Sequence, residues 1–249
     1  MSQKGSNASK KRFKDIMTGN FSKKFLTRVW IPIMLAIFIG FLAIAWLLFP
    51  GYDWTEMAIS LLGNPQEHPN GWYFWAIGMA VTGFLMFPIP FYVYKTLQVD
   101  NENVKKIGCF LLLLSSFGMM GMGAIPNFDQ INWLHEINAG FAMGGLYLGL
   151  FILEFSIIKD KRIKKIWVVL FLGCLWFGPV GFCITQFPGY FATGEFKDIG
   201  PWFLHFSTWE WALMVCVFVA FLLSAFIMPE KNVEDELEIK NNMKKVNNK

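Results

Sequence analysis

Apolar residues along the chain collect into six long runs that are separated by short polar connections. A helix needs roughly 20 apolar residues to cross about 30 Å of hydrocarbon, and each run is of about that length. The predicted spans are Trp30–Phe49, Phe74–Tyr94, Ile107–Ile125, Ile137–Ile158, Ile166–Ile184 and Phe206–Ile227. The pattern therefore predicts an all-α fold, a polytopic integral membrane protein with a bundle of six transmembrane helices.

The polar ends divide the chain into three parts. Residues 1–29 form a basic N-terminal segment, residues 30–227 form the six-span transmembrane domain, and residues 228–249 form a charged tail that we expect to be mobile.

The Lys and Arg residues lie on alternate connections. Of these 22 residues, 21 precede span 1 or follow spans 2, 4 and 6, and the exception is Lys197. Because cytoplasmic connections carry an excess of Lys and Arg, both termini are predicted to be cytoplasmic. We expect a multi-pass protein of the plasma membrane.

The amino-acid composition excludes several classes of protein and of binding partner. The chain has 249 residues, of which 55% are hydrophobic and 16% charged, and its net charge is +4. The short connections leave no room for a large soluble domain, which excludes most soluble enzymes. Because the basic residues flank the spans, no nucleic-acid partner is expected. Membrane lipids are the expected partners, and the oligomeric state stays open.

The basic stretch over residues 10–28 also contains Phe13, Ile16, Phe21 and Phe25. This mixture is typical of an interfacial helix that lies on the anionic lipids of the inner leaflet. A solvated tail is the alternative.

Small residues indicate where helices approach one another closely. The fourth span contains Gly140-x-x-x-Gly144 and Gly145-x-x-x-Gly149, and the third contains Gly118, Gly121 and Gly123. Helices in a bilayer pack most closely through such residues, so these two spans are predicted to be tight neighbours.

Proline residues indicate where two of the spans bend. Pro88 and Pro90 are predicted to bend the end of the second span, and Pro179 the fifth, because proline removes a helical hydrogen bond.

Polar residues with possible chemistry gather on the predicted outer side. The candidate site there consists of His135, His205, Glu210, Asp53 and Glu56. If the bundle brings the starts of spans 4 and 6 together, His135, His205 and Glu210 could hold a zinc ion with one position open for water. The favoured expectation is that there is no cofactor and that the histidines bond to neighbouring helices.

The stretch Asp53-Trp54-Thr55-Glu56 has the spacing of a capping box, in which Asp53 accepts from backbone amides and Glu56 reaches back. It predicts a short helix over Trp54–Leu62 that ends at Gly63.

Glu210 lies about one turn inside the sixth span, where an unpaired charge costs several kcal/mol. It should therefore point inward toward a partner. The candidate partners are His205, Thr208 and His135, and both a structural and a functional role stay open.

Two stretches carry a family resemblance. They are Ile59-Ser60-Leu61-Leu62-Gly63-Asn64-Pro65, followed by Trp72–Tyr94, and Gly123-Ala124-Ile125-Pro126, followed by His135. Together they resemble the uncharacterised six-span membrane family known as domain-of-unknown-function family 998. Leu61 replaces an Asp of that family's pattern, which weakens any suggestion of a catalytic carboxylate in this connection. Trp209-Glu210-Trp211 is similar to the end of the DRAM-like family, the damage-regulated autophagy modulators, which also have six spans.

Three hypotheses for function follow. The first is a non-enzymatic bundle that binds lipid or a partner in the bilayer. The second is a metal-dependent lipid hydrolase with an outward-facing site of histidine and carboxylate residues. The third is a small-solute or proton-coupled transporter that uses Glu210 and the Pro179 kink.

Overall fold

The computed structural model describes residues 13–98, 101–128, 131–193, 201–202 and 205–230. This part of the chain is helical and contains no strand. Six of its helices are long and apolar enough to cross a membrane, namely Lys23–Leu47, Trp72–Thr96, Glu102–Ala124, Asn132–Lys159, Lys165–Pro188 and Phe206–Ile227. The prediction of an all-α, six-span protein is confirmed. Residues 1–12 of the basic segment and the predicted mobile tail beyond residue 230 lie outside the described residues.

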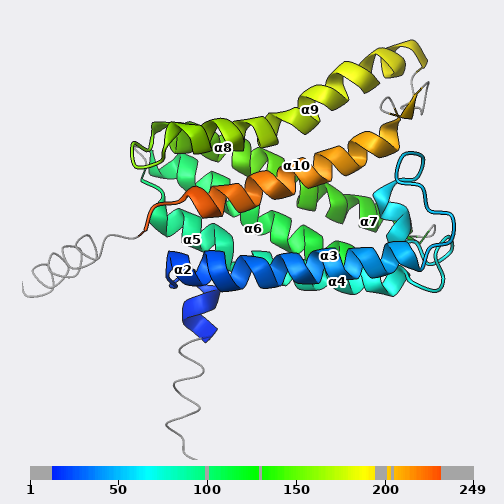
Figure 1. The fold of residues 1–249 in the computed structure, drawn as a ribbon, viewed down its shortest axis with the longest axis horizontal. Helices are drawn as coiled ribbons and strands as arrows, with labels where there is room; N and C mark the ends of the chain where they lie inside the picture. The colour runs from blue at the N-terminus through cyan, green and yellow to red at the C-terminus, as the bar shows by residue number, and fades with distance from the viewer. Residues whose placement is uncertain (1–12, 99–100, 129–130, 194–200, 203–204, 231–249) are drawn as a thin grey trace, which may run out of the picture.

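Several spans consist of shorter elements joined end to end (Figure 1). The first contains α2 (Lys23–Phe25), the π-helical η1 (Leu26–Trp30) and α3 (Ile31–Leu47), and the second contains α4 (Trp72–Met86) and α5 (Pro88–Thr96). The third is α6 (Glu102–Ala124), and the fourth contains α7 (Asn132–Ala139), the π-helical η4 (Gly140–Gly144) and α8 (Gly145–Lys159). The last two are α9 (Lys165–Thr193) and α10 (Phe206–Ile227), and a 3-10 turn, η2 (Ile59–Gly63), lies between α3 and α4.

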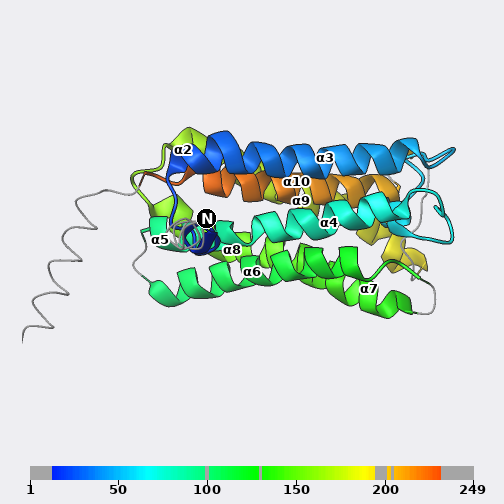
Figure 2. The ribbon, with the colours of Figure 1, turned by 90° about the horizontal axis from the view of Figure 1, so that it is seen from below.

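The helices run along one common direction, with α4 between α3 and α6 (Figure 2). The third span, α6, also packs against α8, and α10 packs against α9. One end of the bundle holds the connection between α3 and α4 and the starts of α7 and α10, and we call it the histidine end. The opposite end holds the connection from α8 to α9, and we call it the arginine end.

Glycines allow α6 to lie directly against the backbones of α4 and α8. A Cβ atom added at Gly145 would lie 2.7 Å from the carbonyl oxygen of Leu111, and one at Gly149 would lie 3.0 Å from that of Gly108. Gly83 of α4 has the same relation to Met120, at 2.7 Å from its nitrogen. The predicted close contact of spans 3 and 4 is confirmed. A Cβ at Gly140 or Gly144 would meet nothing within 4 Å, so these two glycines do not contribute to it.

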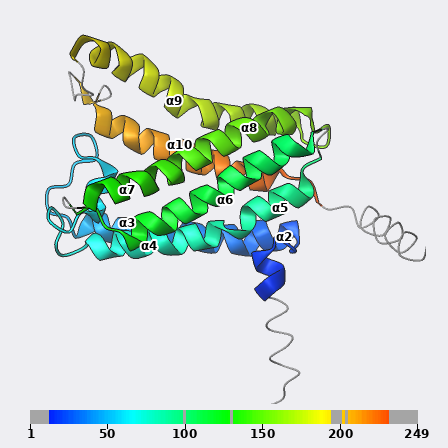
Figure 3. The same ribbon diagram turned by 180° about the vertical axis from the view of Figure 1, so that it is seen from behind.

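The prolines divide the second span and lie within a bent fifth one. Helix α4 ends at Met86 and α5 begins at Pro88, as the sequence predicts. Helix α9 continues through Pro179 and Pro188. It bends away from α7 and η4 toward the histidine end, which Figures 1 and 3 show. The bend separates the outer half of α9 from the fourth span.

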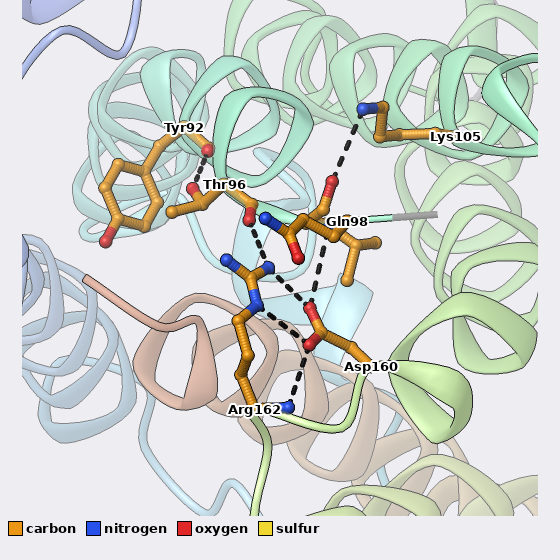
Figure 4. A network of polar contacts seen from close by, with 7 residues as sticks. Tyr92, Thr96, Gln98, Lys105, Asp160 and Arg162 are labelled. Atoms are coloured by element: carbon orange, nitrogen blue, oxygen red, sulfur yellow. Dashed lines mark hydrogen bonds and ion pairs between the residues drawn. The ribbon is translucent and has the colours of Figure 1, made fainter. Parts of the chain in front are cut away.

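An ion pair between the exposed Arg162 and the buried Asp160 joins the connections at the arginine end (Figure 4). The Arg162 guanidinium lies 2.6 and 2.9 Å from the two carboxylate oxygens of Asp160, and donates to the carbonyl oxygen of Thr96 at 2.8 Å. Asp160 also accepts from the backbone nitrogen of Gln98 at 3.4 Å. Burial alone would raise the pKa of Asp160, but the hydrogen bonds from Arg162 and Gln98 outweigh it and hold that pKa below its usual range.

We expect Gly145→Ala to lower the apparent melting temperature of the detergent-purified protein, because the added methyl group would displace α6 and cost about 1–3 kcal/mol. Gly173→Ala is the matched control, since a Cβ there would meet nothing within 4 Å. Equal melting temperatures for the two variants would contradict the close contact of α6 and α8.

We expect Asp160→Ala to destabilise the protein by about 2 kcal/mol at neutral pH, since the Gln98 N–H loses its acceptor and Arg162 keeps only the carbonyl oxygen of Thr96. The pKa of Asp160 is lower in the folded chain than in the unfolded one, so its contribution is complete above about pH 4 and is lost as the pH falls further. Melting curves at pH 7 and pH 3 should therefore show the difference between wild type and variant shrinking at pH 3. A difference of the same size at both pH values would exclude an ionic contribution.

Candidate functional site

Three side chains from the start of α10 hold the connection between α3 and α4. His205 donates from Nδ1 to the carbonyl oxygen of Thr55 at 2.8 Å, and the Glu210 carboxylate accepts from the backbone nitrogen of Ile59 at 3.1 Å. Trp211 donates from Nε1 to the Tyr52 hydroxyl at 3.0 Å. These residues are about 150 positions apart in the sequence, so the sixth span fixes the path of a connection that follows the first.

The helix predicted over Trp54–Leu62 is wrong. Residues 54–56 form a turn, and regular structure begins only at η2. Side chains form hydrogen bonds with backbone groups that would otherwise bond within a helix. The Glu210 carboxylate accepts from the Ile59 N–H, and the Tyr52 hydroxyl lies 3.1 Å from the carbonyl oxygens of Met57 and Ala58. Burial in this cluster raises the pKa of Tyr52.

Asp53 caps a tighter turn than the capping box predicts. Its carboxylate accepts from the backbone nitrogen of Thr55 at 2.9 Å and from its hydroxyl at 2.7 Å. These hydrogen bonds hold the pKa of Asp53 below its usual range. Asp53 is exposed, and neither it nor Glu56 lines the cavities described below. The structure therefore separates these two carboxylates from His135 and Glu210, whereas His205 lies beside them through its hydrogen bond to Thr55.

His135 is buried, with 3% of its surface exposed, and only one of its ring nitrogens is bonded. Nδ1 donates to the carbonyl oxygen of Ile125 at 3.1 Å. Nε2 has no hydrogen-bond partner among the described residues, and the same is true of Nε1 of the buried Trp75. The two rings are neighbours, with centroids 5.8 Å apart. Two neighbouring side chains in the histidine end thus each carry one unsatisfied polar atom.

His135 and Trp75 line a cavity of about 410 Å³, which we call the His135 cavity. Its other polar lining residues are Ser60, Asn127, Asn132, Glu136 and Glu210. Its apolar wall consists largely of methionines, namely Met79, Met119, Met122, Met143 and Met214. Unbranched methionine side chains adapt to the shape of what they contact.

A second hollow of about 570 Å³, which we call the α8–α9 cleft, adjoins the first. It is lined almost entirely by apolar side chains, including Tyr147, Leu148, Phe151, Leu175, Trp176 and Phe182. Leu148, Phe151 and Trp176 are exposed, so the cleft opens on the side of the bundle. Glu210 and Met143 line both hollows, so the two hollows are neighbours.

The structure brings together only part of the predicted zinc set. His135 and Glu210 share a cavity, whereas His205 lies on Thr55 and is absent from the cavity lining. In the part of the chain that is described, no three His, Cys, Asp or Glu side chains form a group that could hold a metal ion. The partners of Glu210 are also different from the predicted ones, since they are the backbone N–H of Ile59 and the side chain of Ser60.

Sequence reasoning missed Trp75, Ser60 and the methionines. A tryptophan or methionine at helical spacing is typical of any apolar helix face, so the sequence holds no signal that these residues line a cavity. The position of Ser60 depends on the hydrogen bonds from α10.

Of the comparisons with known proteins, the one with protein-family models finds a match. No curated protein and no solved structure matches the chain. The comparisons do not show the similarity of Trp209-Glu210-Trp211 to the DRAM-like family. A family model described as "Protein of unknown function (DUF998)" matches residues 32–220, which include the second to fifth spans and most of the first and the sixth. The chain therefore belongs to the DUF998 family.

Proposed function

We propose that this protein is a non-enzymatic membrane bundle that binds one amphipathic lipid, with the lipid's polar group in the His135 cavity and its chain in the α8–α9 cleft. The observation that carries the proposal is that Glu210 and Met143 line both hollows. One hollow is apolar and opens sideways, where hydrocarbon would surround the bundle. The other contains buried polar atoms that need partners.

The two unsatisfied atoms favour a lipid with a hydroxyl group. A carbonyl oxygen only accepts, so Nδ1 of His135 carries the proton toward Ile125 and Nε2 is the acceptor of the neutral ring. Nε1 of Trp75 is a donor. A hydroxyl group both donates and accepts, and can therefore serve both atoms. A buried polar atom without a partner costs about 1–3 kcal/mol, which such a ligand would offset.

The distribution of charged residues indicates which side of the membrane the proposed lipid site faces. The excess of Lys and Arg on alternate connections favours cytoplasmic termini, as in the sequence-based prediction. The His135 cavity would then face the outer leaflet of the plasma membrane, so the lipid would enter from that leaflet.

We expect Gly144→Leu to reduce the amount of lipid that copurifies with the protein severalfold. Gly144 lines the α8–α9 cleft, and a Cβ there would meet nothing within 4 Å, so the leucine fills the cleft without disturbing helix packing. The measurement is native mass spectrometry of the full chain in a mild detergent.

Gly140→Leu is the matched control for this experiment. It lies in the same π-helix, a Cβ there also meets nothing within 4 Å, and it lines neither hollow. We expect it to retain the lipid of the wild type. Equal retention by the two variants would reject the cleft as a lipid site.

We expect His135→Phe to weaken binding of a hydroxyl-bearing lipid by about tenfold, which corresponds to one lost hydrogen bond in a buried site. Binding of a matched lipid without the hydroxyl group should change by less than twofold. Titrations of the purified protein with the two lipids measure this difference, and equal weakening for both would count against the assigned polar group.

The metal-dependent hydrolase is the alternative that the same variant tests. His135 donates its Nδ1 proton to a backbone carbonyl, as zinc-binding histidines commonly do. Elemental analysis that found one zinc ion per wild-type chain, lost in His135→Phe, would favour the hydrolase over simple lipid binding.

A further inference from the structure

The arginine end contains a polar cavity that the proposed function does not use. It has a volume of about 500 Å³ and lies between the connection from α5 to α6 and the end of α8. Its lining consists of Gln98, Asn101, Val104, Phe155, Ser156, Lys159, Asp160, Lys161 and Arg162. We call it the arginine-end cavity.

The charge of this lining is positive. Among the described residues of the lining, Asp160 is the single acidic one, and Arg162 neutralises it through two short contacts of 2.6 and 2.9 Å. Figure 4 shows the guanidinium directed at Asp160 and at the carbonyl oxygen of Thr96. Lys159 and Lys161 are exposed and add two further positive charges. The cavity therefore presents a net positive charge to an entering group.

The start of α6 adds to this field. Asn101 is the N-cap of this 23-residue helix, and both Asn101 and Val104 line the cavity. The first turn of a helix carries partial positive charge that suits an anion. In this turn the Asn101 side chain accepts from the Asn103 N–H, and the charge of Glu102 is offset by an ion pair with Lys105 at 2.6 Å. The Ser156 hydroxyl supplies one more donor on the opposite wall.

An apolar path leads from the cavity along the outside of α8. Phe155 lines the cavity and is 52% exposed, and Leu148, Phe151 and Ile158 are exposed at helical spacing on the same helix. Residues three or four positions apart lie on one helix face, so these four side chains form a continuous apolar strip. A ligand with both an anionic group and a hydrocarbon chain fits this arrangement.

We propose that the arginine-end cavity binds the phosphate group of an anionic phospholipid, with an acyl chain along the strip on α8. Lys159, Lys161 and the first turn of α6 hold the phosphate, and Phe155 contacts the start of the chain. The charge bias predicts that this end faces the cytoplasm, where anionic lipids supply a negative surface. The phosphate site lies at the opposite end from the His135 cavity, whereas the far part of the strip, Leu148 and Phe151, also lines the α8–α9 cleft.

The test compares two doubly substituted variants of the full chain. Lys159→Gln with Lys161→Gln removes the two lysines of the cavity, and Lys164→Gln with Lys165→Gln removes the same charge from the same connection outside the cavity lining. Native mass spectrometry with phosphatidylglycerol gives the dissociation constants. We expect a loss of about tenfold for the first variant and less than twofold for the second.

Two further arms identify the ligand. Phosphatidylcholine with the same acyl chains should bind at least tenfold more weakly than phosphatidylglycerol, and soluble glycerol phosphate should not displace the lipid. Equal weakening of the two double variants would overturn the proposed site in favour of a general electrostatic attraction. Displacement by glycerol phosphate would overturn the lipid assignment in favour of a soluble phosphate ester.

Discussion

Close approach of helices through glycine is the constraint on which the arrangement of the bundle depends. Between helices in a bilayer the hydrophobic effect contributes little, so small residues decide which pairs come into close contact. Gly83, Gly145 and Gly149 hold α4, α6 and α8 together. Helix α9 uses its glycines differently, since a Cβ at Gly178 would lie 3.1 Å from Leu213 of α10. Helix α9 is therefore packed to α10 and bent away from α7 and η4, and the cleft between α8 and α9 is the result.

The histidine end depends on a second constraint, which is the satisfaction of backbone polar groups in a connection without regular structure. Side chains of α10 and Tyr52 bond to the backbone of residues 55–59, where water or a helix would otherwise do so. This explains how the sixth span accommodates Glu210 near its start. The carboxylate serves a structural role toward Ile59 while it remains part of the cavity wall.

Much of the fold could be predicted from the sequence, because the length and apolar character of each span are local properties. The second span was expected at Phe74–Tyr94 and extends over Trp72–Thr96, and the sixth has the expected bounds. The connection after the first span could not be predicted, since Asp53 to Glu56 match a capping box while the deciding partners lie in α10. The predicted zinc site requires His205 to lie near His135. The sequence could not show that His205 forms a hydrogen bond with the carbonyl oxygen of Thr55 instead. The sequence identifies His135 and Glu210 as candidate residues, whereas it does not identify their apolar neighbours in the cavity wall.

Because the α8–α9 cleft opens sideways, any molecule that fills it enters from the bilayer and not from water. A molecule that enters from the bilayer is already dehydrated along its chain, so its transfer from water makes no contribution to selectivity. The relevant concentration is a mole fraction within one leaflet, where ordinary lipids compete for every site. Occupancy is then an exchange reaction, and discrimination rests on the difference in free energy between one lipid and the next. A minor membrane component would fill the cleft only if the polar end favours it by enough to offset its low abundance.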